Sequence, residues 1–269
     1  MNLSRRRFLA AGAGLAAAAA GGSLLRSNEL EAVATSDPGR REGSPPLRVA
    51  LATDMHAPRD SFEAETLARI VADFDPHLLL VAGDAINRRG DEQLVRAYAE
   101  LPARLGKFAA LGNWEYQGDC DVSRLRREYE RAGVRLLVNE RVVVDVGGER
   151  LEIVGLDDLL RGRPRLDLVR RDGDPRADRS LVMAHCPALF DHVARASPTP
   201  ALVLSGHTHG GQITPFGHVF LTPPGSAGYV KGWYGTPGAR HRLYVSRGLG
   251  NSRIPLRIGS RPEISLLTL

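Results

Sequence analysis

Short apolar runs that end in polar residues recur along the chain from residue 47 onward. The runs at 78–82 and 201–205 are almost continuously apolar, as expected of parallel strands that are covered on both faces. Runs at 47–53, 107–111 and 181–185 have the same texture. The pattern therefore predicts five buried strands over these ranges.

Helical periodicity appears between the first and the second of these strands. Apolar residues at i, i+3, i+4 and i+7 from Leu67 predict a helix that begins near Asp60 and ends at Pro76. The same spacing predicts helices over 91–104 and 121–132. Strand and helix patterns thus alternate in this half of the chain, which is typical of βαβ units.

Beyond residue 133 the pattern becomes richer in β-strands. Short strands are predicted at 134–138, 142–146, 151–156, 219–221, 243–246 and 263–267. Gly147-Gly148 predicts a hairpin between two of them, and a helix is predicted near 188–196. Residues 157–178 are polar and basic, which favours a surface excursion. Two packed sheets with helices outside both would accommodate this order of elements.

Ligand-type residues stand at the ends of the five buried strands. They are Asp54, His56, Asp84, Asn113, His185, His207 and His209. In open α/β sheets, ligands bind just outside the carboxyl ends of the strands. His207 and His209 lie two residues apart, so an extended backbone would point both imidazoles to one side. This mixture of oxygen and nitrogen donors suits divalent transition metals, and we expect a metal site here.

The first 34 residues are expected to lie outside the fold. Arg5-Arg6, within Ser4–Leu9, resembles the twin-arginine export motif, and the Ala/Gly-rich segment 10–25 is too short and too weakly apolar for a membrane span. Ala32-Val33-Ala34 offers a cleavage site before Thr35. We therefore expect a signal peptide over 1–34, a linker over 35–46, a domain over 47–269, and export by the twin-arginine machinery to the periplasm or cell envelope.

Composition and charge exclude only a few classes of protein and partner. The chain has 269 residues, of which 43% are apolar and 25% charged, as in ordinary globular domains. The formal charge is +5, and it is +3 without residues 1–34, which hold four Arg and two Glu. This balance gives no reason to expect a nucleic-acid partner. Two cysteines, Cys120 and Cys186, would permit one disulfide in an exported protein.

The motifs together resemble a known family. Asp54-x-His56, Gly83-Asp84, Gly112-Asn113, His185 and Gly206-His207-Thr208-His209 occur in the order of the calcineurin-like metallophosphoesterases. The tail from Tyr244 to Ile264 resembles their bacterial, often exported, branch. The resemblance implies an α/β fold: a four-layer α/β/β/α sandwich of two mixed β-sheets flanked by helices.

The same resemblance implies a phosphoesterase with two divalent metal ions, Mn, Fe or Zn. It would hydrolyse phosphate mono- or diester or pyrophosphate bonds of a phosphorylated small-molecule or lipid-linked substrate, through a metal-activated water. By motif position, Asp54, His56, Asp84 and His209 would hold one ion. Asp84, Asn113, His185 and His207 would hold the other, so that Asp84 bridges the two. Two such ions can clamp the attacking and leaving oxygens of a phosphoryl transfer.

One motif departs from the family pattern. Relatives usually read Gly-Asn-His-Asp/Glu, whereas this chain reads Gly112-Asn113-Trp114-Glu115. The family's histidine helps to protonate the leaving group, and tryptophan has no titratable group. The activity is then attenuated, or another group substitutes, or the substrate has a leaving group that needs little protonation. Trp114 could also stack on a substrate ring or simply pack.

Two further readings stay open at this point. One is a pyrophosphohydrolase similar to the UDP-diacylglucosamine hydrolases of envelope lipid metabolism, and the other is a metal-binding scaffold that has lost turnover with Trp114. Arg247 and Arg257 are candidates for phosphate contacts, although surface ion pairs would explain them equally well. Trp233 could line a substrate groove or pack within its loop.

Overall fold

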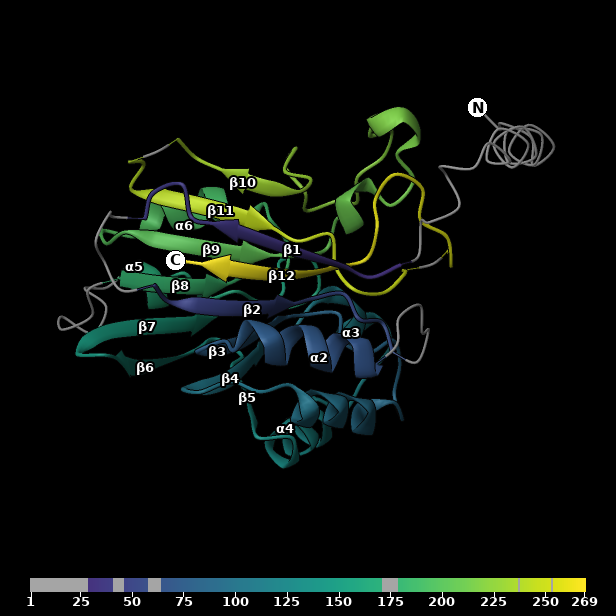
Figure 1. Ribbon diagram of the computed structural model, residues 1–269, viewed down its shortest axis with the longest axis horizontal. Helices are drawn as coiled ribbons and strands as arrows, with labels where there is room; N and C mark the ends of the chain where they lie inside the picture. The colour runs from purple at the N-terminus through teal and green to yellow at the C-terminus, as the bar shows by residue number, and fades with distance from the viewer. Residues whose placement is uncertain (1–28, 41–45, 58–63, 171–178, 237, 253) are drawn as a thin grey trace.

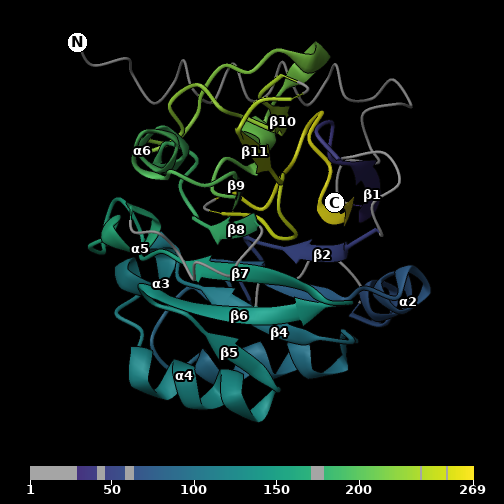
Figure 2. The same ribbon diagram turned by 90° about the vertical axis from the view of Figure 1, so that its left-hand side faces the viewer.

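Two β-sheets face each other, and helices cover the outer face of each sheet (Figures 1 and 2). The computed structural model describes residues 29–269 except 41–45, 58–63, 171–178, 237 and 253. Within these residues each sheet has six strands. The predicted α/β/β/α sandwich of two mixed sheets is confirmed.

The first sheet has the order β1-β12-β2-β3-β4-β5. Its strands are β1 (Glu31–Ser36), β12 (Glu263–Thr268), β2 (Arg48–Ala52), β3 (Leu78–Ala82), β4 (Gly106–Ala110) and β5 (Val134–Leu136). Strands β2 to β5 run parallel, while β12 pairs antiparallel with β2. The parallel strands therefore bring their carboxyl ends to one edge.

The second sheet has the order β10-β11-β9-β8-β7-β6. Its strands are β10 (Gly232–Tyr234), β11 (His241–Val245), β9 (Ala201–Ser205), β8 (Arg179–Met183), β7 (Glu149–Gly155) and β6 (Glu140–Val146). Gly147 and Gly148, both with positive φ, close the predicted hairpin between β6 and β7. Strands β7, β8, β9 and β11 run parallel, so this sheet also has one carboxyl edge.

Alternate residues of the central strands enter different apolar layers. In β2, Val49 and Leu51 pack between the sheets, whereas Ala50 and Ala52 face the outer helices. The helical segments are α2 (Ala64–Phe74), η1 (Glu92–Glu100), α3 (Asn113–Gln117), α4 (Val122–Arg131), α5 (Asp167–Arg170), α6 (Leu189–Ala196), η2 (His209–Gly211) and η3 (Pro215–Gly217). Burial on both faces explains why these strands read as continuous apolar runs.

The N-terminal boundary differs from the expectation. Residues Glu31–Ser36 form β1, which pairs in parallel with β12 along its whole length. The expectation that residues 1–34 lie outside the fold is therefore wrong for Glu31–Ala34, and the expected cleavage before Thr35 would cut inside this strand. Residues 1–28, with the twin-arginine motif, lie outside the described residues, so export stays a prediction.

Three expected elements also need correction. The helix predicted over 91–104 is shorter, a 3₁₀ helix over Glu92–Glu100, η1. The apolar residues 219–221 form no strand and are exposed, because they belong to a surface loop. The start of the expected excursion at 157–178 is not at the surface, since Asp157 and Asp158 are buried. Among the described residues, none of the helices has the length and apolarity needed to cross a membrane.

Candidate metal centre

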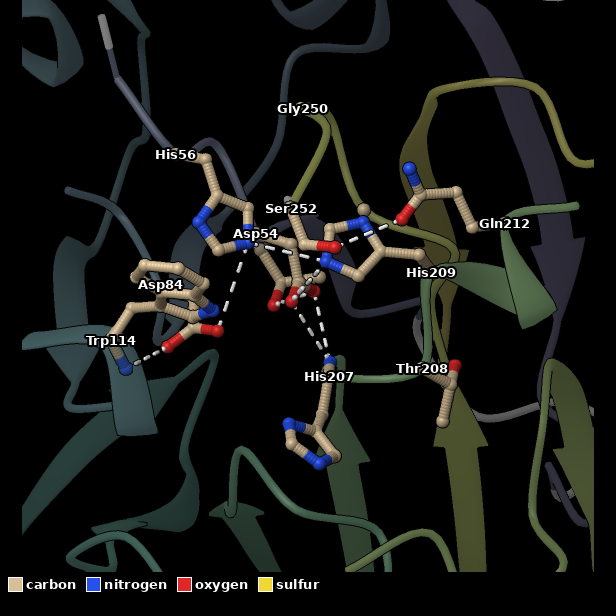
Figure 3. A network of polar contacts seen from close by, with 12 residues as sticks. Asp54, His56, Asp84, Trp114, His207, Thr208, His209, Gln212, Gly250 and Ser252 are labelled. Carbon is tan, nitrogen blue, oxygen red and sulfur yellow. Dashed lines mark hydrogen bonds and ion pairs between the residues drawn. The ribbon is translucent and has the colours of Figure 1, made fainter. Parts of the chain in front are cut away.

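The predicted ligand residues meet at the shared carboxyl edge of the two sheets (Figure 3). β2 leads into Asp54 and His56, β3 into Asp84, β8 into His185, and β9 into His207 and His209. Two groups form there, each with its ligand atoms within 4.8 Å of one another. They are Asp54 with His56 and His209, and Asp84 with His185 and His207. All six side chains are buried.

Asp84 lies between the two groups. Its Oδ2 atom is 3.1 Å from Nε2 of His185 and 3.8 Å from Nε2 of His56. Its other oxygen, Oδ1, accepts the backbone N–H of Trp114 at 2.8 Å. One carboxylate oxygen is thus fixed by the backbone while the second faces histidines from both groups.

The turns that present these residues have left-handed backbone. Asp54, His56, Asp84, His207 and His209 all have φ between 51° and 73°. Non-glycine residues rarely adopt this conformation, and it clusters where function needs it. At Gly206 a Cβ atom would overlap Thr53 Oγ1 and the Asp54 carboxylate, so only glycine permits the close approach of β9 to β2.

Three histidines have one ring nitrogen engaged and the other aimed into the site. Nδ1 of His56 donates to Asn87 Oδ1 at 2.9 Å, and Nδ1 of His185 donates to the Ala82 carbonyl at 2.8 Å. Nε2 of His207 donates to the Pro224 carbonyl at 2.7 Å. Such partners fix the tautomer and leave the opposite nitrogen as a metal ligand. Asn87 was missed in the sequence, because no spacing rule connects it to His56.

His209 has a different partner. Nη2 of the fully buried Arg257 donates to Nδ1 of His209 at 3.1 Å. Burial lowers the pKa of His209 well below its usual value, and Arg257 lowers it further. A neutral ring that accepts at Nδ1 carries its proton on Nε2. Ligation through Nε2 would therefore require this proton to leave or to move to Nδ1, with a shift of the Arg257 contact.

Charges in the site favour an ionised Asp84. Burial raises the pKa of Asp84, but the neighbouring His185 and His56 and the Trp114 N–H outweigh burial and bring the pKa down to about 2. Burial lowers the pKa of His185, but Asp84 and Asp54 outweigh it and raise the pKa well above the usual value. A divalent cation bound here would replace the proton of His185, as metal binding to histidine generally does.

Asn113 tests whether the residues suit a metal. Its side-chain Oδ1 atom is buried and has no hydrogen-bond partner among the described residues. A buried carbonyl oxygen without a partner costs free energy, and a hard or borderline cation would satisfy it. With three histidines already oriented, the residues fit divalent metal ions, although His209 needs the rearrangement described above.

Comparisons with known proteins agree with this geometry. Residues 47–211 match the family model of the calcineurin-like phosphoesterases. The metallophosphoesterase YkuE of Bacillus subtilis is 30% identical, over 99% of this chain and 98% of YkuE. The phosphodiesterase YaeI of Escherichia coli is 29% identical over 99% of both chains. The metallophosphoesterase Cj0846 of Campylobacter jejuni is 32% identical, over 92% of this chain and 64% of its own.

The chain belongs to the calcineurin-like phosphoesterases. It is therefore a hydrolase that acts on phosphoester bonds. Proteins of this family typically use divalent metal ions, and the two groups of buried carboxylates and histidines are where this phosphoesterase could hold them. The resemblance drawn from the motif order is confirmed.

Trp114 lies beside the centre in this phosphoesterase. The residue is the second of the short helix α3 after β4, and its ring meets His56 edge-on with centroids 5.5 Å apart. The ring is half-buried, and Figure 3 shows it next to Asp84. The indole thus lies on the His56 side of the centre, at the position where the family resemblance implies a histidine.

Glu115 is a functional residue whose role the sequence did not reveal. Its carboxylate accepts the backbone N–H groups of Ala85 at 2.7 Å, Gly112 at 2.9 Å and Asp84 at 3.2 Å. It therefore ties the turn after β3 to the turn after β4. Burial, and then the charge of Asp84, raise the pKa of Glu115 to about 7, against the effect of these N–H donors. The spacing from Gly112 is that of a capping box, which is the signal available in the sequence.

The candidates for substrate contacts make contacts with other residues of the protein. Trp233 donates from Nε1 to Thr35 Oγ1 at 3.0 Å and packs on Tyr244, where β10 meets β11. Arg247 forms ion pairs with Glu263 and Glu31 at 2.6 and 2.9 Å. Arg257 donates to backbone carbonyls as well as to His209. Each of these side chains thus has protein partners that already account for its place.

The two cysteines do not form the disulfide that the sequence would permit. Both thiols are free and buried. Cys186 donates from Sγ to Asp158 Oδ1 at 3.2 Å, whereas Cys120 packs in the apolar layer beneath α4. Asp158 also accepts the N–H groups of Leu160 and Arg161, so it anchors the segment after β7 next to His185.

Proposed function

We propose that this phosphoesterase hydrolyses phosphodiester or pyrophosphate bonds through two divalent metal ions. Asp54, His56, Asp84 and His209 would hold one ion, and Asp84, Asn113, His185 and His207 the other. The observation that carries the proposal is the place of Asp84 Oδ2, which faces His185 of one group and His56 of the other. A single oxygen so placed suits a carboxylate shared by two cations.

The protein's own residues would set the charge and orientation of the centre. Bound divalent ions would supply positive charge that stabilises the phosphoryl oxygens of the substrate. Asp54 and Asp84 balance that charge, and neutral Asn113 adds none. The backbone N–H of His207 donates to both oxygens of Asp54, at 3.1 and 3.0 Å, and so fixes the rotation of this carboxylate.

Trp114 bears on the choice of substrate. An indole cannot give a proton to a departing alkoxide, whereas general acid catalysis is typically worth about 10²–10⁴-fold in rate. We propose that the substrates have acidic leaving groups, such as an aryl alcohol or a phosphate. The half-buried ring beside His56 would also limit the access of water to that side of the centre.

Reconstitution tests the proposal. The purified chain is loaded with Mn²⁺, Fe²⁺ or Zn²⁺, and its metal content and its turnover of an aryl phosphodiester are measured. We expect two ions per chain, and loss of both ions and of turnover in Asp84→Ala. Asp73→Ala, which removes an exposed carboxylate from α2, is the matched control. Two tightly bound ions in a folded Asp84→Ala protein would contradict the shared-carboxylate assignment.

A further inference from the structure

Large hydrophobic side chains are exposed mainly on two loops beside the metal centre. Among the described residues, six of the eight exposed ones lie in the segments 213–222 and 254–258, here called the apolar loop pair. They are Phe216, Val219, Phe220, Leu221, Ile254 and Leu256. The exposed fractions of Phe216, Leu221 and Phe220 reach 87%, 82% and 68%. A concentration of this kind marks an interaction surface.

The two loops are fastened to each other. Gln212 donates from Nε2 to the carbonyls of Ile254 at 2.6 Å and Leu256 at 3.1 Å. The N–H of Thr214 donates to the Ile258 carbonyl at 2.7 Å. Figure 1 draws both loops, in light green and yellow, beyond the ends of β9 and β11. The exposed side chains therefore form one surface on a shared base.

This surface adjoins the metal centre. Gln212, at the base of the first loop, follows His209 by three residues. From the second loop and its end, Arg257 donates to the His209 ring, and Ser260 donates from Oγ to the His209 carbonyl at 2.7 Å. A surface that covers the apolar loop pair would therefore lie next to the carboxyl edge of the sheets, where the candidate metal centre is.

The two loop segments and their flanks carry only positive charges, while Glu29 and Glu31 from the start of the fold pair with Arg261 and Arg247. Segments 212–231 and 246–262 contain no Asp or Glu, whereas they contain Lys231 and the four arginines 247, 253, 257 and 261. Lys231 is exposed, and Arg261 is partly exposed. A second copy of the chain on this face would bring like charges together, which opposes association. An anionic surface would instead be attracted.

The beginning of the fold lies on the same side. The N–H of Glu31 donates to the Pro262 carbonyl at 2.9 Å, and Arg261 contacts Glu29 at 3.3 Å. Residues 1–28, with their Ala/Gly-rich stretch, are thus joined to the fold directly beside the second loop. A chain whose residues 1–28 engage a membrane during export would present the apolar loop pair to the same membrane.

We propose that the apolar loop pair docks on the surface of an anionic lipid bilayer. Phe216, Phe220 and Leu221 enter among the acyl chains, Lys231 and Arg261 face the headgroups, and the carboxyl edge of the sheets faces the membrane. Apolar side chains on a protruding, basic surface are what interfacial binding requires, because affinity comes from buried apolar area together with attraction to anionic lipid. The inference does not rest on the substrate proposed above.

Fluorescence in the full-length chain tests this docking directly. A tryptophan is introduced by Phe220→Trp, and a matched control carries Leu105→Trp, at an exposed leucine outside the loop pair. Vesicles of phosphatidylcholine with phosphatidylglycerol and brominated acyl chains are added. We expect quenching and a shift to shorter wavelength of the added signal in Phe220→Trp only. Equal signals in both variants, or no quenching in either, would overturn the proposal.

Vesicle partitioning of serine variants gives a second readout. Replacing Phe216, Phe220 and Leu221 by serine should weaken binding to the anionic vesicles by about 10²–10³-fold, judged from the apolar surface removed. Leu105→Ser with Leu160→Ser should leave binding unchanged. A dimer that dissociates in the triple variant, with no vesicle binding by wild type, would assign the surface to a second copy. A short-wavelength signal from Phe220→Trp before vesicles are added would assign it to residues 1–28.

Discussion

The two sheets contribute different chemistry to the centre. The first sheet leads into the candidate oxygen donors, Asp54, Asp84 and Asn113, together with the imidazole of His56. The second sheet supplies the imidazoles of His185, His207 and His209. Each sheet alone offers only part of a ligand set, so the candidate metal centre requires the contact between the two sheets. This contact is here called the seam.

The two sheets also support their ligands differently. On the first sheet, backbone N–H groups hold carboxylates, as when Trp114 donates to Asp84 and Glu115 accepts from the adjacent turns. On the second sheet, carbonyl oxygens hold the rings of His185 and His207, and the Ala82 carbonyl that accepts from His185 belongs to β3 of the first sheet. Ligand orientation therefore depends on contacts that cross the seam.

The largest expected change in turnover comes from adding an imidazole to the residues that follow the strands of the first sheet. Trp114→His should restore proton donation to the leaving group and raise kcat/KM for alkyl esters by up to about 10²–10⁴-fold, while aryl esters change little. The measurement is kcat/KM against leaving-group pKa. Trp114→Phe, aromatic but unable to donate a proton, should keep the steep dependence of wild type. A flat wild-type plot would show that another group already supplies the proton.

Removal of bound metal should lower the thermal stability of the contact between the two sheets. One ion present at about 100 times its dissociation constant stabilises the folded state by about 2.7 kcal/mol. In a domain of this size each kcal/mol corresponds to roughly 2–4 °C, so a chelator should lower Tm by about 5–10 °C. Calorimetry with and without chelator measures the shift. Asp84→Ala should show almost none, and an equal shift in that variant would place the ions elsewhere.

Gly206→Ala should strain the seam without removing a ligand. A Cβ atom there overlaps Thr53 and the Asp54 carboxylate, and overpacking of this kind costs about 1–3 kcal/mol. Denaturant unfolding should show this loss together with lower metal affinity. Gly148→Ala, in open space at the β6–β7 turn, should lower stability through its left-handed φ alone and leave metal affinity unchanged.

The smallest effect is expected at the far edge of the seam. Thr35→Val removes the acceptor for Trp233 Nε1, which joins β1 of the first sheet to β10 of the second. The loss should be about 0.5–1.5 kcal/mol, and turnover should not change. Exposed Thr236→Val is the control. If unfolding of the two variants is identical, the Thr35–Trp233 hydrogen bond does not contribute to stability in solution.

The meeting of the candidate ligand residues at one edge was predictable because the strands before them are buried on both faces. A run such as Leu78–Ala82 is readable without periodicity, and the polar residue that follows it must lie at the edge of the sheet. Helical periodicity predicted the outer helices α2 and α4, the helix expected near 188–196 is α6, and Gly147-Gly148 predicted the β6–β7 hairpin. The sequence therefore revealed the centre of the fold better than its margins.

The errors share a physical origin. Residues 219–221 are as apolar as a strand, but the sequence does not record that they have no partner strand and stay exposed. Strand β1 was missed because Ala32-Val33-Ala34 was interpreted as a cleavage site after the twin-arginine motif, although exposed and half-buried residues alternate along the segment. The partners of Trp233, Arg247 and Arg257 come from distant segments, so no local pattern could have assigned them.

The left-handed turns at the centre have a consequence for engineering. Five residues that could bind metal hold a conformation that costs a non-glycine residue about 1–2 kcal/mol. Selection for heat resistance alone would favour glycine at these positions, and each replacement by glycine would delete a candidate donor. The most robust variant of this chain and its most active variant are therefore different sequences, and a screen has to reward both properties at once.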